Sequence, residues 1–274
     1  MNASLLESIK LGKGIHMFKQ ECSRVKFSVG KHAFSKECLE KAQELWRVKP
    51  GKYDGTIMGV IKVSKKQGVV AIEVAPMKFS IFRYIAKCRE EGKALPKGDE
   101  VLPIGVASIT YYKDKTGERY FLMGIKAKGN IGGGKIEFVP QGFCNPPDSQ
   151  DMSNYVEDTI TRELQEELTA QGQKKQDIGF KQIKNLALVV EDFASDYAFQ
   201  VACEVEQKAL SKCDGISTEE HERIFIVKES ELGQVIKDPT AFVNKRLPNM
   251  KKKSIVMDEG SKALLYSYMI KQKE

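Results

Sequence analysis

Residues 136–168, IEFVPQGFCNPPDSQDMSNYVEDTITRELQEEL, carry the pattern that decides the fold. A short apolar run is followed by a loop rich in Pro and Asp, and then by a segment of helical periodicity. Its apolar positions recur every four residues: Val156, Ile160, Leu164 and Leu168. This spacing predicts an amphipathic helix from about Ser153 to Ala170, with one buried face. Ser153 or Asp151 is the predicted cap of its first turn.

Three carboxylates lie close together on this predicted helix. Glu163, Glu166 and Glu167 are at positions i, i+3 and i+4, so they project from neighbouring points on one side. Like charges at this spacing repel one another, and a hard divalent cation such as Mg²⁺ or Mn²⁺ offsets that repulsion with carboxylate ligands. Arg162 is four residues before Glu166 and can orient its carboxylate by pairing with it.

The flanking segments predict a mixed α+β protein. Residues 35–47 have helical spacing with Ser35 as the expected cap, and residues 79–93 predict a second helix. Two β-hairpins are expected: residues 55–63 with 68–74, and residues 102–112 with 119–127. Further strands are predicted over residues 183–193, 197–206 and 222–228, followed by a short helix at 230–236 and a C-terminal helix over 259–274. A boundary near residue 100 would separate an N-terminal α+β region, 1–100, from a catalytic domain, 101–274.

Composition restricts the class of protein. The chain has 274 residues, 41% of them hydrophobic, which is enough for a sizeable core. No apolar stretch approaches the roughly 20 residues that span a bilayer, and no signal peptide is recognisable, so we expect a cytoplasmic protein without membrane contact. The six cysteines form no Cys-x-x-Cys pair and are interpreted as free thiols. Cys144 stands beside the acidic helix.

Charge is distributed unevenly along the chain. The formal net charge is +7, and residues 1–100 carry 20 Lys and Arg against 11 Asp and Glu, whereas the rest carries 24 against 26. Such an excess of basic residues can favour RNA binding, although dispersed lysines on a solvated surface are the more common explanation. A lone histidine among glutamates, His221, is interpreted as a surface residue.

The string Arg162-Glu163-Leu164-Gln165-Glu166-Glu167 resembles the core of the Nudix box, and the upstream Phe138-Val139-Pro140-Gln141-Gly142 resembles the aromatic and Pro-Gly-Gly turn of that family. The resemblance spans roughly residues 102–235, with the box itself from Gly142 to Ala170. It implies a Nudix-type α/β/α sandwich with a mixed β-sheet. The box departs from the family pattern at three points: about six residues are inserted before the helix, Asn154 stands where a glutamate is expected, and Thr169 replaces a glycine.

The resemblance implies a role for each matching residue. Glu166 and Glu167 match the principal metal ligands, Glu163 a further ligand or base, and Arg162 the orienting arginine. Further contributions are expected from outside the helix: the Gln141 backbone carbonyl and Glu220 (or, alternatively, Glu222) at the metal, and Lys126, Lys128 and Gly142 at the substrate.

Together these features predict a divalent-metal-dependent hydrolase that cleaves a phosphate anhydride. The favoured substrate is a nucleoside diphosphate linked to another moiety, such as a nucleotide sugar or a dinucleotide. Two alternatives stay open: a catalytically inactive Nudix-fold module that binds nucleotides, and an RNA-end pyrophosphohydrolase of the decapping type. A homodimer is compatible with the sequence.

Overall fold

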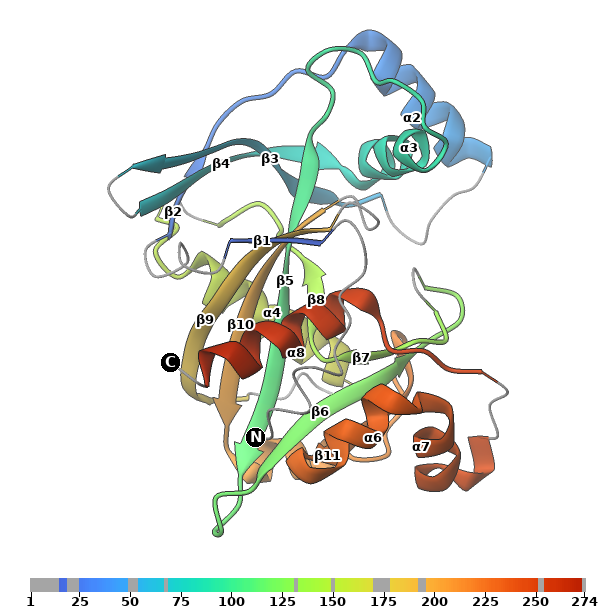
Figure 1. The fold of residues 1–274 in the computed structure, drawn as a ribbon. Helices are drawn as coiled ribbons and strands as arrows, with labels where there is room; N and C mark the ends of the chain where they lie inside the picture. The colour runs from blue at the N-terminus through green and yellow to red at the C-terminus, as the bar shows by residue number, and fades with distance from the viewer. Residues whose placement is uncertain are drawn as a thin grey trace.

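The computed structural model describes residues 15–18, 25–48, 54–66, 69–130, 133–148, 151–169, 178–191, 196–250 and 254–272. Within these residues the chain is a mixed α+β protein built on one large twisted sheet (Figure 1). The end of the predicted acidic helix at Ala170, and Cys22, lie outside the described residues. None of the described helices is long and apolar enough to cross a membrane.

The sheet contains parallel and antiparallel pairs. Its main path runs β1-β9-β10-β5-β3-β4-β2, and β6, β7, β8 and β11 attach to it at β5 and β6. β10 is parallel to β5, and β2 is parallel to β4, whereas the other pairs are antiparallel. The strands are β1 (Ile15–Phe18), β2 (Val25–Val29), β3 (Thr56–Lys66), β4 (Val69–Lys78), β5 (Leu102–Lys113), β6 (Arg119–Lys126), β7 (Ile136–Phe138), β8 (Gln141–Phe143), β9 (Phe180–Glu191), β10 (Asp196–Val205) and β11 (His221–Lys228).

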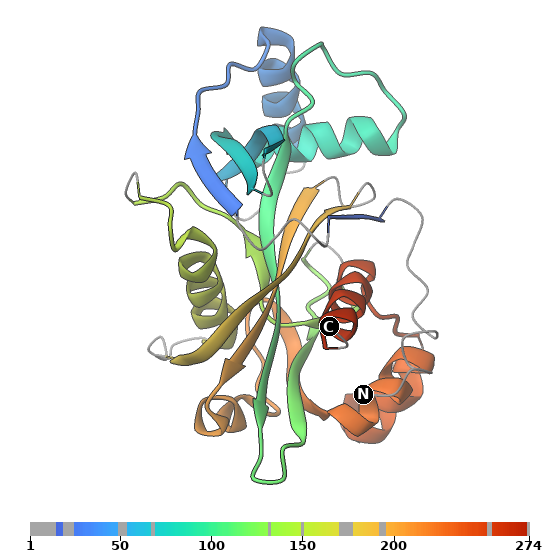
Figure 2. The ribbon, with the colours of Figure 1, turned by 60° about the vertical axis from the view of Figure 1, so that its left-hand side comes forward.

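Helices cover both faces of the sheet. α4 (Tyr155–Leu168) and α8 (Glu259–Lys271) lie on opposite sides of the central strands, as Figure 2 shows. The side chains of β6 contact both helices, because successive side chains of a strand point to opposite faces of the sheet. Phe121 and Met123 pack in one core with α8, while Leu122 packs in another with Leu164 of α4. The observed architecture is therefore helix, mixed sheet and helix.

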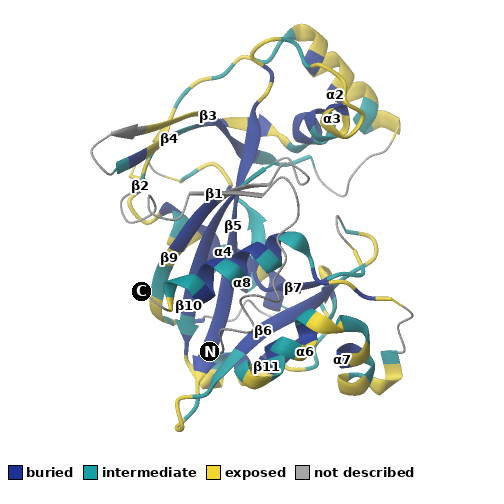
Figure 3. Cartoon of the chain, viewed as in Figure 1, coloured by how far each residue is buried: buried dark blue, intermediate teal, exposed yellow. Residues whose placement is uncertain are grey.

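The central strands are buried on both faces. Figure 3 shows β5 and β6 as buried along most of their length. Burial on both faces accounts for their nearly continuous apolar sequence, since neither face meets water. The smaller helices α6 (Leu232–Lys237) and α7 (Pro239–Arg246) close the α8 side of this core, with Val235 and Phe242 buried there.

The described segments of the first hundred residues join the same sheet. α2 (Lys36–Val48) and α3 (Phe79–Glu90) pack on each other and on the hairpin of β3 and β4. β3 pairs with β5 through Gly59–Pro103 and Val60–Leu102. The Met58 backbone N–H also donates to the carbonyl of Cys144 at 2.8 Å. These bonds connect the hairpin to the segment that precedes α4.

Most predicted elements are confirmed, including both hairpins and the capping of α2 by Ser35, whose hydroxyl accepts from the Cys38 N–H at 3.1 Å. The predicted cap of α4 was wrong. The N-cap is Asn154, with no side-chain capping bond, and Asp151 instead accepts from the Ser153 N–H in the preceding turn. Sequence periodicity missed β8 and α7, which have only three and eight residues.

Candidate active site

α4 presents two carboxylates inward although they are charged groups. Glu163 and Glu167 are only 9% and 2% exposed, whereas Glu166 is exposed. Ile160, Leu164 and Leu168 fix this orientation, because they are fully or almost fully buried against the sheet and set the rotation of the helix. The three predicted carboxylates therefore share one region of the helix, but only two of them point into the protein.

Strand β8, which comes before α4 in the chain, leaves room for Glu163 because it carries a glycine. A Cβ added at Gly142 would lie 2.1 Å from the carboxyl carbon of Glu163, far inside any real contact. Gly142 lies in β8, which pairs with β5 through Val106. The absence of a side chain at position 142 thus allows the Glu163 carboxylate to lie against the β8 backbone.

The second buried carboxylate also contacts this backbone. The Gln141 N–H donates to Oε1 of Glu167 at 2.8 Å. The other oxygen, Oε2, is buried without a hydrogen-bond partner in the described part of the chain. A buried carboxylate oxygen without a partner is energetically costly, so it is suited to a cation or a donor from a ligand.

Arg162 binds both neighbouring carboxylates and the strand below. Its guanidinium lies 2.5 Å from Glu163 Oε1 and 3.0 Å from Glu166 Oε2, and it also donates to the carbonyl of Phe143 at 2.8 Å. Arg162 therefore lies as expected beside Glu166, and it additionally orients Glu163. The planar guanidinium suits this task because it offers several donors in fixed directions.

A buried polar cluster lies next to Glu167. Glu137 of β7 is 3.2 Å from the Lys126 ammonium and 2.9 Å from His221 Nε2, and the same nitrogen is 3.6 Å from Glu167 Oε2. A Cβ added at Gly124 would lie 2.4 Å from the imidazole, so this glycine makes room for the ring. The sequence-based interpretation of His221 as a surface residue was wrong, because its ring is fully buried. The register of β11 on β6 accounts for the burial of the ring, because His221 at the start of β11 pairs with Lys126 at the end of β6.

Burial shifts the pKa values of these acids in different directions. Burial raises the pKa of Glu163 to about 7, against the opposing effect of Arg162. The pKa of Glu167 is raised well above its ordinary value by burial and by the charge of Glu137. Burial also opposes ionisation of Glu137, but Lys126 and His221 outweigh it and hold the pKa of Glu137 below its ordinary range. Glu137 is therefore the ionised member of the buried set.

Replacing Lys126 with Met should destabilise the fold more at pH 8 than at pH 4. The pKa of Glu137 is depressed in the native state, so its stabilising contribution is present above the ordinary value of 4.5 and is lost as the pH falls. Removing one partner of a buried pair costs about 3 kcal/mol or more. Urea unfolding at the two pH values measures the difference. Lys128→Met, an exposed neighbour, serves as the control, and equal losses at both pH values would contradict the assignment.

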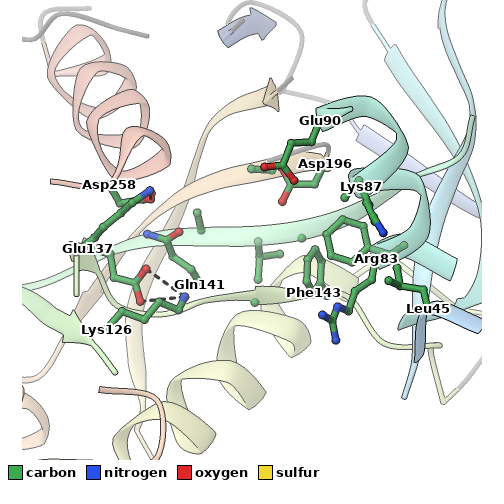
Figure 4. A pocket seen from close by; sticks show the side chains of 18 of the residues that line it. Leu45, Arg83, Lys87, Glu90, Lys126, Glu137, Gln141, Phe143, Asp196 and Asp258 are labelled. Atoms are coloured by element: carbon green, nitrogen blue, oxygen red, sulfur yellow. Dashed lines mark hydrogen bonds and ion pairs between the residues drawn. The ribbon is translucent and has the colours of Figure 1, made fainter. Parts of the chain in front are cut away.

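A cavity of about 770 Å³ opens beside this cluster (Figure 4). One part of its wall comes from Lys126, Glu137, Gln141 and Gly142, of which Gln141 and Gly142 contact the α4 carboxylates. The opposite part comes from α2 and α3, with Leu45, Phe82, Arg83, Ala86, Lys87, Glu90 and Glu91. α2 and the α3 segment, from the first hundred residues, thus supply one side of the cavity. Its volume lies in the range of small-molecule binding sites.

The remaining predicted residues take different positions. Lys126 lines the cavity, whereas Lys128 is exposed and is not part of its wall. The Glu220 side chain is exposed, yet it lies close enough to raise the pKa of Glu163 and of Glu167, after burial and nearer charges. Cys144 is buried and free, and burial raises the pKa of its thiol to about 12, so it stays protonated at neutral pH.

The donor set is of the right kind for a hard divalent ion. Among the described residues, no three His, Cys, Asp or Glu side chains already stand in a metal-ligating group. Nevertheless, Glu163 and Glu167 are desolvated acids with raised pKa values, and Oε2 of Glu167 accepts no hydrogen bond from a described residue, with His221 Nε2 3.6 Å away. A divalent cation favours the ionised form of such acids and satisfies the orphaned oxygen. The residues present therefore fit a Mg²⁺ or Mn²⁺ site.

Comparison with known proteins gives matches among solved structures alone. No protein-family model matches the sequence, and no curated protein matches it. A MutT/nudix family protein from Enterococcus faecalis is 15% identical, with a TM-score of 0.33 over 51% of this chain and 48% of that chain. A MutT protein from Methanosarcina mazei Go1 is 16% identical, with a TM-score of 0.28 over 45% of this chain and 75% of that chain. This chain therefore aligns with about half of the Enterococcus protein.

Proposed function

We propose that this protein is a divalent-metal-dependent hydrolase that cleaves a phosphate anhydride in a nucleoside diphosphate linked to another moiety. One observation carries the proposal: α4 holds the Glu163 and Glu167 carboxylates against the backbone of Gln141 and Gly142, which form the wall of the cavity. The Nudix-like order of Arg162, Glu163, Glu166 and Glu167 in the sequence supports the same reaction.

The proposed roles follow from the contacts. Glu163, Glu166 and Glu167 would hold Mg²⁺ or Mn²⁺, with the Gln141 carbonyl and Glu220 as further ligands. When bound, such an ion lowers the pKa of a water molecule and neutralises charge on phosphoryl oxygens. Arg162 orients Glu163 and Glu166 through its two ion pairs. Lys126, at the cavity wall, would contact a substrate phosphate. Gly142 has no side chain, so it would let the substrate approach the backbone of β8 closely.

The arrangement of the chain in two parts belongs to the same proposal. Residues 101–274 would form the catalytic domain, and residues 1–100 an N-terminal region whose α2 and α3 complete the cavity. On this view, the N-terminal region contributes to the choice of substrate and not to the cleavage step.

Purified protein incubated with Mg²⁺ or Mn²⁺ and a panel of nucleotide sugars and dinucleotides should release nucleoside monophosphate. EDTA should abolish the release, because the carboxylates then have no ion to hold. Product formation is followed by chromatography. The absence of turnover across the panel with both ions would reject the hydrolase.

A second candidate is a nucleotide-binding module of the same fold without catalysis. The departures at Asn154 and Thr169, and the lack of a ready ligand group among the described side chains, favour it. Calorimetric titration with Mn²⁺ distinguishes the two candidates. A binding site that Glu167→Gln removes supports the hydrolase, whereas nucleotide binding that is independent of Mn²⁺, without turnover, supports the module.

A further inference from the structure

The cavity extends well beyond the polar residues at one end. Lys126, Lys135, Glu137 and Gln141 line that end, and the cavity continues past β5 and β10 to α3. Asp196 and Ala198 of β10 line this continuation, whereas Asp258, the residue that precedes α8, lines the cavity near Glu137 (Figure 4). In Figure 4, Asp196 lies among the side chains of α3, away from Lys126 and Gln141. A ligand that fills the cavity therefore carries a second group, which meets Asp196.

Asp196 carries one carboxylate oxygen that no described residue satisfies. Its Oδ1 is buried, and no described residue donates a hydrogen bond to it. Burial, and then the negative charge of Asp258, raise the pKa of Asp196 to about 7. Asp258 by contrast has partners, since it accepts from the Ser261 N–H at 3.2 Å and lies 3.5 Å from the Lys135 ammonium. Asp196 is thus a buried acceptor in the cavity wall that a ligand can satisfy.

The buried Oδ1 of Asp196 requires a donor group from the ligand. This end of the cavity combines the carboxylates of Asp196, Glu90 and Glu91 with the cations of Arg83 and Lys87, so its charge is mixed. Lys126 and Lys135 line the other end and can contact the anionic part of a substrate. A carboxylate accepts up to four hydrogen bonds and commonly receives two from adjacent hydroxyls. The apolar ring of Phe143, also in the wall, can pack on the carbon face of a cyclic group.

We propose that Asp196 binds the hydroxyl groups of a sugar attached to the diphosphate of the substrate. This inference rests on the proposed function for its substrate, but it concerns binding and not cleavage. It assigns the sugar to the end of the cavity lined by β10 and α3, and the phosphates to the end lined by Lys126, Lys135 and Gln141. Asp196 would then be a specificity residue contributed from outside the acidic helix.

Calorimetry in EDTA tests the proposal without catalysis. Two matched pairs of probes are used: ADP with ADP-ribose, and UDP with UDP-glucose. For at least one pair, the wild-type protein should bind the sugar-bearing member about 10-fold more tightly or better, as expected for hydrogen bonds to a charged acceptor. Asp196→Ala should remove this difference and leave the affinity for the diphosphate alone unchanged.

Two further variants serve as controls for Asp196→Ala. Asp196→Asn preserves the shape of the side chain and one acceptor oxygen, so it should retain part of the preference for the sugar. Asp148→Ala changes an exposed carboxylate outside the cavity wall and should behave as wild type. Melting temperatures establish that all three variants fold.

The outcomes separate this inference from the hydrolase. The absence of a sugar preference in both pairs, or a preference that Asp196→Ala leaves intact, overturns the sugar site, even if the protein hydrolyses nucleotides. Binding of putrescine that Asp196→Asn abolishes would also overturn it, by assigning the site to a cation. A sugar preference that depends on Asp196, found in a protein without turnover, upholds the site and rejects the hydrolase.

Discussion

Glu167→Gln should abolish hydrolysis while making the protein more resistant to unfolding at pH 8. The Gln141 N–H can still bind the amide oxygen of the new side chain, so the backbone contact survives. The charge that would hold the metal ion is lost. Changes in groups that merely support metal ligands reduce function 10- to 100-fold, so loss of a ligand should reduce kcat/KM by roughly 100-fold or more.

Glu167→Gln should lower activity but raise stability at pH 8, and the gain in stability follows from the raised pKa of Glu167. The native pKa of Glu167 is raised well above 4.5 by burial and by Glu137. As the pH rises from 4.5 through that raised value, the wild-type protein loses stability, because the buried carboxyl must ionise. Gln does not titrate, so in EDTA the variant should gain stability at pH 8 and differ little at pH 4. Denaturant unfolding at both pH values measures this.

A variant on the same helix provides the control. Asp158 is exposed in the first turn of α4, so Asp158→Asn should keep both activity and the pH profile of stability. Undiminished turnover of Glu167→Gln would remove Glu167 from the site. Loss of stability of Glu167→Gln at pH 8 would instead show that the Glu167 carboxylate stabilises the fold through an ion pair with the Lys126 cluster.

Gly142→Ala should reduce both activity and stability, because the new methyl group would occupy the position of the Glu163 carboxylate. The clash at 2.1 Å involves the end of a side chain that is itself packed and paired with Arg162. Overpacking of this kind costs about 1–3 kcal/mol. Differential scanning calorimetry should record a lowered melting temperature, and hydrolysis should fall along with it as Glu163 is displaced.

A double-mutant cycle identifies the cause. With Glu163→Ala already present, the added methyl group meets no carboxylate, so Gly142→Ala should then cost much less. Gly179→Ala, where a Cβ would contact nothing within 4 Å, is the matched control and should be nearly neutral. Additive effects of the two changes at positions 142 and 163 would show that the clash is not the cause.

The local patterns of the chain determined a large part of this structure. The four-residue repeat of apolar side chains specified α4 and its buried face, because a helix returns every fourth residue to the same side. The same geometry specified that Glu163, Glu166 and Glu167 are neighbours and that Arg162 reaches Glu166, which the 3.0 Å ion pair confirms. The hairpins were also predictable, since turn residues and apolar runs lie close together in sequence.

Tertiary structure decided which of these carboxylates are buried and what surrounds them. The hydrogen bond between Glu137 and His221 joins residues 84 positions apart, and it depends on the register of β11 on β6. No local pattern reveals that register, because β6 is buried on both faces and its sequence shows no alternation. Asp196 and α3 likewise meet in one cavity only through the pairing of β10 and β3 with β5. Local periodicity fixes the direction of a side chain relative to its own helix or strand, whereas burial and charge environment depend on contacts between segments distant in sequence.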